Sequence, residues 1–265
     1  MPSRRRLLQT ASAGLAGAGA VTLAASGAET DPSASSAWPM ARHDPAGTAH
    51  TTESGPKNDV ELAWSHDRAA WFQGTTEPSL SGGTLYAAGA GVLALDPETG
   101  ARRFGAAGPY YSTPARASTS VYTAETLAVT SATGPSGLNS SGGIQLPVVG
   151  SVGVERWAAP TPAHQGLFSS PTERPTPVAA GGTVVTATPD RESLVALDGD
   201  SGDVRWRATP TDGSASVSFN RPAVRDDVVY ATAWPYRASA YDLDTGARRW
   251  HRELDEQLLL APVAT

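Results

Sequence analysis

The sequence predicts an all-β fold made of repeated four-stranded antiparallel sheets. Three segments share one pattern: Ala, any residue, Asp, three residues, Gly, three residues and an aromatic side chain; they are residues 94–104, 196–206 and 240–250. Short apolar runs between Asp- and Gly-containing turns surround each segment. Such runs are typical of antiparallel strands, and a repeat of about 45 residues is the size of one propeller blade. We therefore expect a β-propeller.

The last repeat indicates how the four strands of a blade follow one another. An apolar run over 222–233 is interrupted by the polar turn Asp226–Asp227 and gives the first two strands. Residues 238–243 and 247–252 give the third and fourth. Between them, the Asp242 side chain can accept bonds from backbone N–H groups two residues on, and Gly246 supplies the positive φ that closes a hairpin.

The same order of strands and turns can be followed through the other units. Four predicted strand cores align with one another: Thr84–Ala88, Ser120–Ala124, Thr183–Ala187 and Val228–Thr232. The unit between Thr130 and Trp157 is irregular, because it keeps a Gly-x-x-x-Trp end at Gly153 and Trp157 but lacks Ala-x-Asp. We expect a divergent blade that carries surface loops and a Pro- and Ser-rich connection over 160–177.

The repeated positions are predicted to be structural. A blade cannot cover its own faces alone, so neighbouring blades share the repeated aromatic residues as core, and loss of one costs about 3–5 kcal/mol. The repeated Asp residues are expected to cap turns rather than to catalyse. The complete set of predicted repeat positions is Ala94, Asp96, Gly100, Phe104, Gly153, Trp157, Ala196, Asp198, Gly202, Trp206, Ala240, Asp242, Gly246 and Trp250.

The repeated pattern resembles the pyrroloquinoline-quinone-type (PQQ) repeat family of β-propellers, over residues 38–265. The resemblance implies that each terminal Trp docks between blades, against backbone near the repeat Gly. Residues 38–49 are similar to the lead-in that many exported members place before their first strand. The family includes quinone-dependent dehydrogenases, envelope scaffolds and sensor domains, so the resemblance indicates a fold and not a function.

The number of units is smaller than the resemblance implies. Val60–Trp64 is predicted to be the outermost strand of a closing blade, four complete units follow, and Leu258–Thr265 begins another unit. Family members usually have seven or eight blades, so about four complete blades with a partial first and last one indicate an incomplete ring. We expect self-association, or further C-terminal blades, to cover the exposed edges.

The N-terminus predicts export. Residues 3–9 carry Arg4 and Arg5 in the twin-arginine signature, and no charged residue occurs from Leu7 to Ala28. A signal peptide over 1–28 is expected, with cleavage after Ala28 and a flexible tether over 29–37. An uncleaved anchor is the alternative, since about 20 residues can span a bilayer. The chain has no Cys, which excludes a lipid anchor on that residue. The predicted location is extracytoplasmic, secreted or at the cell envelope.

Composition limits the class of partner. Removing the signal takes away three Arg and no acid, so the formal net charge changes from −6 to −9. An acidic surface disfavours nucleic acid, whose binding depends on phosphate contacts. Lys57 is the one lysine among mostly Arg cations, and with many acids and an Ala-, Gly- and Thr-rich chain this composition resembles proteins of salt-loving archaea.

The sequence contains no arrangement of residues that is typical of a catalytic site. The resemblance implies that enzymatic members hold a quinone and Ca²⁺ at the propeller centre, with carboxylate and amide ligands and often a vicinal Cys pair, whereas this chain has no Cys. None of its histidines has tight metal-ligand spacing; they are His43, His50, His66, His164 and His251. No Ser/His/Asp signature is present. We therefore expect no catalytic residue, no cofactor and no metal.

The predicted function is that of an exported, non-catalytic interaction scaffold, bound to an envelope or secreted protein. Two alternatives remain open on the sequence. The first is a fragment of a PQQ- and Ca²⁺-dependent alcohol or sugar dehydrogenase, which the resemblance alone favours. The second is an extracytoplasmic ligand-sensing domain.

Overall fold

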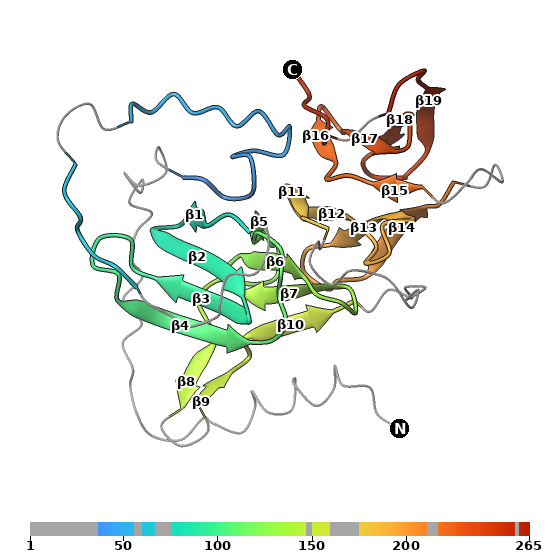
Figure 1. Ribbon diagram of the computed structural model, residues 1–265. Coiled ribbons are helices and arrows are strands. Elements are labelled where there is room, and N and C mark those ends of the chain that lie inside the picture. The colour runs from blue at the N-terminus through green and yellow to red at the C-terminus, as the bar shows by residue number, and fades with distance from the viewer. Residues whose placement is uncertain are drawn as a thin grey trace, which may run out of the picture. The chain divides into compact units, whose positions relative to one another are not determined.

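The structure is a computed structural model that describes residues 37–55, 60–66, 76–146, 150–159, 175–210, 217–257 and 260–265. These residues form nineteen strands and no helix (Figure 1). No helix that could span a membrane is therefore found in this part of the chain. The predicted signal peptide with Arg4, Arg5 and Ala28, the tether up to residue 36, His164 and the connection over 160–174 lie outside the described residues.

Four sheets share one strand order, in which each strand pairs with the next one of its blade. Blade 1 consists of β1 (Ser79–Ser81), β2 (Thr84–Gly89), β3 (Gly91–Leu95) and β4 (Arg102–Ala107). Blade 2 consists of β5 (Ala115–Ala117), β6 (Thr126–Thr130), β7 (Pro135–Asn139) and β10 (Glu155–Ala158). Blade 3 consists of β11 (Val178–Ala180), β12 (Thr183–Ala187), β13 (Leu194–Asp198) and β14 (Val204–Ala208). Blade 4 consists of β16 (Ala223–Arg225), β17 (Val228–Trp234), β18 (Arg237–Asp242) and β19 (Arg248–Glu253).

Two additions extend this pattern. A short strand, β15 (Ser218–Phe219), pairs with the far end of β17 and makes the sheet of blade 4 five-stranded. A separate hairpin of β8 (Ile144–Leu146) and β9 (Gly150–Val152) is inserted between β7 and β10. The divergent blade thus keeps all four of its strands, and part of its predicted loop is a hairpin.

The predicted fold class is confirmed. The chain forms an all-β, incomplete propeller of four antiparallel blades, because every pairing between named strands is antiparallel and each blade has the predicted four strands. The turn at Asp226–Asp227 also lies where it was expected, with φ values of +49° and +59°.

One predicted strand core is wrong. Ser120–Ala124 is not a strand; blade 2 uses Thr126–Thr130 instead, all of it buried. Val121 and Tyr122 are exposed, and Ser120 donates through its backbone N–H and its hydroxyl to Asp200 of blade 3. The other blades join their first two strands by a two-residue turn, whereas blade 2 has a longer connection that displaces the strand along the sequence.

The predicted strands outside the four blades are not formed either. Residues 60–66 have no strand, and the side chains of Val60 and Leu62 are exposed. Residues 260–265 also form no strand, although the Ala264 N–H donates to the Ala46 carbonyl at 3.0 Å. The described residues offer neither segment a ladder of neighbouring strands to pair with.

The core lies between blades. One buried cluster joins the apolar faces of blades 1 and 2, including Tyr86, Phe104 and Leu127. A larger cluster continues through blades 2, 3 and 4 and includes Trp157 and Trp206. Each blade is therefore stabilised mainly by the apolar surface that it shares with its neighbours.

Candidate functional site

The aromatic residues at the ends of the repeats dock onto the following blade. Trp157, on β10, donates its indole N–H to the Gly199 carbonyl of blade 3 at 2.9 Å. Trp206, on β14, donates in the same way to Leu243 of blade 4 at 2.7 Å. Both side chains are only 7% exposed. Each indole therefore links two consecutive blades through apolar contact and one hydrogen bond.

Trp64 makes the same contact on blade 1, although it belongs to no strand. Its indole N–H donates to the Pro97 carbonyl at 2.9 Å. The three acceptor carbonyls belong to the residue directly after the repeat Asp. The repeat Gly leaves the space, because its φ is positive and a Cβ would lie 2.5 or 2.6 Å from the docked indole; these residues are Gly100, Gly202 and Gly246. We call this unit, from the Asp to the Gly, the acceptor turn.

Blade 2 makes an acceptor turn from different residues. Phe104 packs on Gly142, where a Cβ would come within 2.3 Å of the ring. Phenylalanine has no N–H to donate, and the Tyr86 hydroxyl donates to the Ser140 carbonyl instead, at 2.8 Å. Ser140 follows Asn139, whose side-chain oxygen caps the turn as the repeat Asp does elsewhere. The carbonyl that an indole reaches in the other blades is thus bonded here as well.

The repeat Asp residues cap these turns and pair with Arg. The Asp96 carboxylate accepts two backbone N–H bonds within its turn and an Arg103 bond of 2.8 Å. The same ion pairs join Asp198 to Arg205 at 2.9 Å and Asp242 to Arg249 at 2.8 Å. The Arg hydrogen bond is the largest of the effects that lower the pKa of Asp96 and of Asp242 to about 2. These carboxylates stay ionised to hold the turns and are already bonded.

The repeat Ala lies opposite the aromatic residue of its own blade. Ala94 pairs with Phe104 across β3 and β4, and Ala196 and Ala240 pair with Trp206 and Trp250. Blade 2 has Gly137 opposite Trp157 at this position. Gly153, by contrast, has a φ of +75° and no neighbour within 4 Å of its Cβ position, so it receives no aromatic ring. Gly142 performs that role in blade 2.

Trp250 is the repeat aromatic without an acceptor turn among the described residues. It occupies the position of Trp157 and Trp206 but is 43% exposed. Its ring lies 6.5 Å from that of Tyr230 on the same blade. It lies on β19, all of whose residues are exposed and which forms the edge of its sheet.

Blade 4 displays further large apolar side chains. A cavity of about 360 Å³ lies beside Trp250, and its lining includes Tyr230, Thr232 and Pro262. The exposed large apolar residues of blade 4 and of the segment after it are Trp234, Tyr236, Trp250, Leu254, Leu260 and Val263. Single exposed apolar residues are ordinary, whereas a contiguous patch marks an interaction surface. Trp250 and Val263 line the same cavity. We call these six residues the blade 4 surface.

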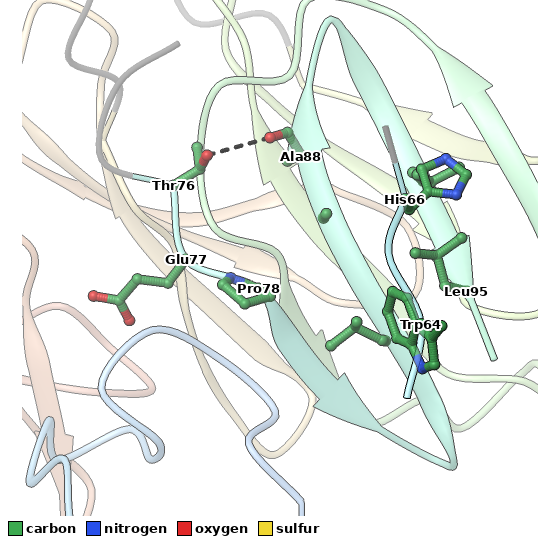
Figure 2. A pocket seen from close by; sticks show the side chains of 10 residues that line it. Trp64, His66, Thr76, Glu77, Pro78, Ala88 and Leu95 are labelled. Atoms are coloured by element: carbon green, nitrogen blue, oxygen red, sulfur yellow. Dashed lines mark hydrogen bonds between the residues drawn. The ribbon is translucent and has the colours of Figure 1, made fainter. Parts of the chain in front are cut away.

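A second cavity, of about 260 Å³, lies against blade 1 (Figure 2). Leu85, Leu93 and Leu95 contribute the sheet side of its lining, and Trp64 covers it from outside the sheet. The view shows the Trp64 ring beside Leu95, and the Thr76 hydroxyl bonded to the Ala88 carbonyl at 3.2 Å. This lining is almost wholly apolar, and of the predicted histidines only His66 contributes to it.

The lead-in crosses the free edges of three first strands. Trp38 exchanges two backbone hydrogen bonds with Leu80 of β1. The Pro39 carbonyl accepts from Arg116 of β5 at 3.0 Å, and the Pro45 carbonyl accepts from Val224 of β16 at 2.8 Å. This segment therefore satisfies edge backbone groups of blades 1, 2 and 4 that no blade strand pairs.

Arg221 fixes the lead-in to blade 4. Its guanidinium donates to the carbonyls of Ala41 and Asp44 at 2.9 and 3.1 Å. Burial, with a smaller contribution from the nearby Arg42 charge, lowers the pKa of Arg221 to about 10. Met40 is buried in the larger core cluster, so the lead-in also contributes apolar packing.

A quinone and Ca²⁺ do not fit the donors in the described part of the chain. No group of three or more His, Asp or Glu gathers there, and the repeat carboxylates are bonded to Arg. His43 and His50 line one cavity of about 470 Å³ while His66 lines another, and His251 is exposed on β19. The histidines that the structure describes therefore do not gather at one place.

Comparison with known proteins finds a family match over part of the repeats. Residues 148–264 match the family described as outer membrane protein assembly factor BamB, whose model is built on PQQ-type repeats. Over these residues the chain is similar to that family. Comparison with curated proteins finds no match.

Several solved structures are similar to parts of this chain. BamB from Moraxella catarrhalis is 20% identical, over 69% of this chain and 52% of that one, with a TM-score of 0.48. The present chain thus spans about half the length of that relative. Sqt1 from Saccharomyces cerevisiae is 13% identical over 69% and 49%, with a TM-score of 0.49. A quinohemoprotein alcohol dehydrogenase from Comamonas testosteroni is 18% identical over 82% and 27%, with a TM-score of 0.38.

Three parts of the docking contact were not predicted from the sequence. The Arg directly before each aromatic residue was not singled out, although it recurs as Arg103, Arg156, Arg205 and Arg249. That recurrence was a usable signal. Asn139 with Gly142, and the Tyr86 hydroxyl, carry no repeated letter, and only the spatial arrangement shows their role.

Proposed function

We propose that this protein is an exported, non-catalytic interaction scaffold at the cell envelope. The observation that carries the proposal is the blade 4 surface. Trp157 and Trp206 are buried by a following blade, whereas Trp250 and its apolar neighbours are open to solvent. Exposed aromatic residues next to Arg248, Arg249 and Arg252 on β19 have the composition of protein interfaces, where aromatic and Arg side chains contribute most of the affinity.

The position of the lead-in supports a scaffold over a dehydrogenase. Propeller blades surround a central channel, and the lead-in bonds to the free edges of β1, β5 and β16. Backbone and the buried Met40 side chain thus occupy edges along which an enzymatic member would need open space and free donors. The repeat carboxylates are committed to Arg and to turn N–H groups, which is a structural use.

Two further observations support the location. The twin-arginine signature and the uncharged stretch that follows it predict export. The family matched over residues 148–264 is described as outer membrane protein assembly factor BamB. The partner in this proposal is an envelope or secreted protein, and the acidic chain disfavours nucleic acid.

The test is affinity capture from envelope extracts at native salt, with residues 29–265 as bait. The double variant Trp234→Ala and Tyr236→Ala removes two aromatic residues of the blade 4 surface. The control Val121→Ala removes an exposed residue of blade 2, which is 73% exposed. We expect one protein to be retained by the wild type and the control, and lost with the double variant.

A catalytic assay completes the test. The same protein receives pyrroloquinoline quinone and Ca²⁺, and dye reduction with alcohols and aldoses is followed. Turnover, together with no surface-dependent partner, would overturn the scaffold proposal in favour of the dehydrogenase alternative. Specific binding of a small ligand to the mature protein, without turnover or a protein partner, would favour the sensing domain.

A further inference from the structure

The hairpin inserted into blade 2, β8–β9, has an exposed aliphatic face. Its register pairs Ile144 with Val152, and Leu146 follows Ile144 by two residues on the same strand. Residues two apart on a strand, and residues directly opposite each other, share one face of a sheet. The three side chains are therefore neighbours, and their exposed fractions are 69% for Ile144, 42% for Leu146 and 46% for Val152. We call these three residues the hairpin face.

The hairpin is fixed to the propeller at its base. Gly142, just before it in the chain, receives the Phe104 ring of blade 1. Gly143 lies so close to the Val152 carbonyl that a Cβ there would collide with the oxygen. Among the described residues, the two strands pair only with each other and form a sheet of their own (Figure 1). The hairpin face is thus held in place, but the described part of the chain leaves it open to solvent.

The sequence around the hairpin has almost no charge. Residues 117–154 contain one charged residue, Glu125, and its carboxylate is paired with Arg116. The whole chain, by contrast, has 17% charged residues and a formal net charge of −6. A surface without charges cannot recognise an acidic or a basic segment by ion pairing. The chemistry that complements the hairpin face is therefore uncharged and apolar.

The type of apolar side chain favours lipid over protein. Protein interfaces are enriched in Trp, Tyr and Arg, and few of the residues that contribute most of their affinity are Leu or Val. The blade 4 surface has aromatic side chains of this kind, whereas the hairpin face is wholly aliphatic. Aliphatic side chains on one face of an element can enter the boundary between lipid headgroups and acyl chains. The backbone edges of the hairpin would stay among the headgroups, where water satisfies them.

An amphipathic pair of side chains lies at the same end of blade 2. Because successive strands of this blade are antiparallel, the β5–β6 connection and the insertion between β7 and β10 leave the sheet at one end. Tyr122 lies in that connection, and the Arg156 guanidinium is 4.2 Å from the centre of its ring. Side chains with an apolar body and a polar tip are typical of the headgroup level of a membrane.

We propose that the hairpin face binds the surface of a lipid bilayer. Ile144, Leu146 and Val152 enter the boundary between headgroups and acyl chains, and Tyr122 and Arg156 lie at the headgroup level beside them. This activity is additional to the proposed scaffold function and uses a different blade from the blade 4 surface. It does not require a protein partner.

Vesicles of phosphatidylcholine test the proposal with purified residues 29–265, which lack the apolar stretch of the signal peptide. The triple variant Ile144→Thr, Leu146→Thr and Val152→Thr removes the aliphatic face and keeps residues that suit strands. We expect the wild type to float with the vesicles and the partition coefficient of the triple variant to be about tenfold lower. The control Val204→Thr changes an aliphatic residue of β14 that is 54% exposed, and it should partition like the wild type. Raising the salt concentration should not weaken binding, because salt screens charges and not apolar contacts.

A fluorescent label locates the contact independently of the triple variant. The chain has no Cys, so Leu146→Cys provides a single position for an environment-sensitive dye. Its fluorescence should shift to the blue when vesicles are added, and bromine atoms on the acyl chains should quench it. The same dye attached through Val204→Cys should show neither effect. An unchanged spectrum at position 146 would overturn the proposal even if the triple variant failed to fold.

Other results would assign the hairpin face or the lipid contact differently. Equal flotation of the wild type and a folded triple variant would overturn the proposal, and flotation lost with Trp234→Ala and Tyr236→Ala would assign lipid binding to the blade 4 surface. Self-association without vesicles that the triple variant abolishes would make a second copy the occupant. Hairpin-dependent retention of a protein from envelope extracts, without flotation, would make the occupant a protein. Because the vesicles contain no protein, this test can fail while envelope capture through the blade 4 surface succeeds, and the reverse.

Discussion

The extent to which a repeat tryptophan stabilises this fold depends on whether an acceptor turn receives its ring. Trp206 and Trp250 occupy the same repeat position, opposite Ala196 and Ala240. The first is enclosed by blade 4 and bonded to Leu243, whereas the second has one face open. The residue type and local sequence are alike, so any difference in their energetic role comes from the neighbouring blade.

Substitution of Trp206 and of Trp250 by Ala should lower the stability of the protein by different amounts. Trp206→Ala should lower the free energy of unfolding by about 3–5 kcal/mol, since it removes a buried aromatic residue and leaves a cavity. Trp250→Ala should cost about 1 kcal/mol or less, the usual scale for partly exposed positions. Urea denaturation of both variants measures this. Equal losses would show that Trp206 is not an inter-blade contact.

The capped turns should also make stability depend on pH. The pKa values of Asp96 and Asp242 are lowered to about 2 from the ordinary value of 3.8, and the Arg hydrogen bond is the largest cause. For an acid whose pKa is lower in the folded state, the stabilisation is present above the unfolded pKa. It is lost as pH falls through the folded pKa.

We therefore expect the urea midpoint to fall between about pH 4 and about pH 2. Asp96→Asn with Asp242→Asn should make this part of the profile flatter, because the titrating groups are gone. The loss should be modest, since both carboxylates are at the surface and exposed ion pairs contribute little. An unchanged acid slope in the double variant would assign the pH dependence to other groups.

At the scale of elements, the repeat could be recognised in the sequence because the residues that form its turn lie close together along the chain. The Asp, the Gly and the aromatic residue lie within 11 residues, so blades 3 and 4 could be placed from sequence with their turns and strand order. Blade 2 was placed less well. Its longer connection after β5 shifted the strand from Ser120–Ala124 to Thr126–Thr130, and both runs have strand-like composition. Only burial against neighbouring blades distinguishes them.

The contacts between blades were harder to predict from the sequence than the strands and turns. The sequence identified Trp157, Trp206 and Trp250 as equivalent, but it could not show which of them is received by an acceptor turn. The Tyr86 hydroxyl reaches Ser140 from a position 54 residues earlier, and no repeated letter marks that bond. The route of the lead-in past β1, β5 and β16 likewise depends on contacts between distant segments.

Blade 2 provides a test at the element scale. Gly137 stands where the other blades have Ala, and a Cβ there would lie 2.2 Å from the Trp157 indole. Gly137→Ala should therefore displace Trp157 from the acceptor turn of blade 3. The free energy of unfolding should fall by about 1–3 kcal/mol, as it does when a core is overpacked. Gly182→Ala is the control, because its nearest contact would be 3.6 Å away. Thermal melting of both variants measures the difference, and a neutral Gly137→Ala would show that the indole has space to move.

At the scale of the whole molecule, the blades are joined in two different ways. Consecutive blades are joined through aromatic residues and acceptor turns, so each such contact is local to one pair. The lead-in is joined to blades 1, 2 and 4 by backbone hydrogen bonds and by Arg221. Loss of an aromatic contact should destabilise the two blades that it joins. Loss of a lead-in contact should instead destabilise blades that are not adjacent in sequence.

Arg221→Ala tests this distinction. It removes the guanidinium donor from the carbonyls of Ala41 and Asp44, of which Asp44 keeps a bond from the Gly47 N–H. Loss of a partner to a partly buried polar group costs about 1–3 kcal/mol. Because the lead-in would then open locally more often, amide hydrogen exchange should become faster at Arg116 of blade 2 and Val224 of blade 4, whose N–H groups bond to the lead-in. The control Arg249→Ala removes an exposed ion pair with Asp242 and should leave both amides protected. If exchange at Arg116 stayed slow while Val224 was affected, the lead-in would be held at each blade separately and would not link them.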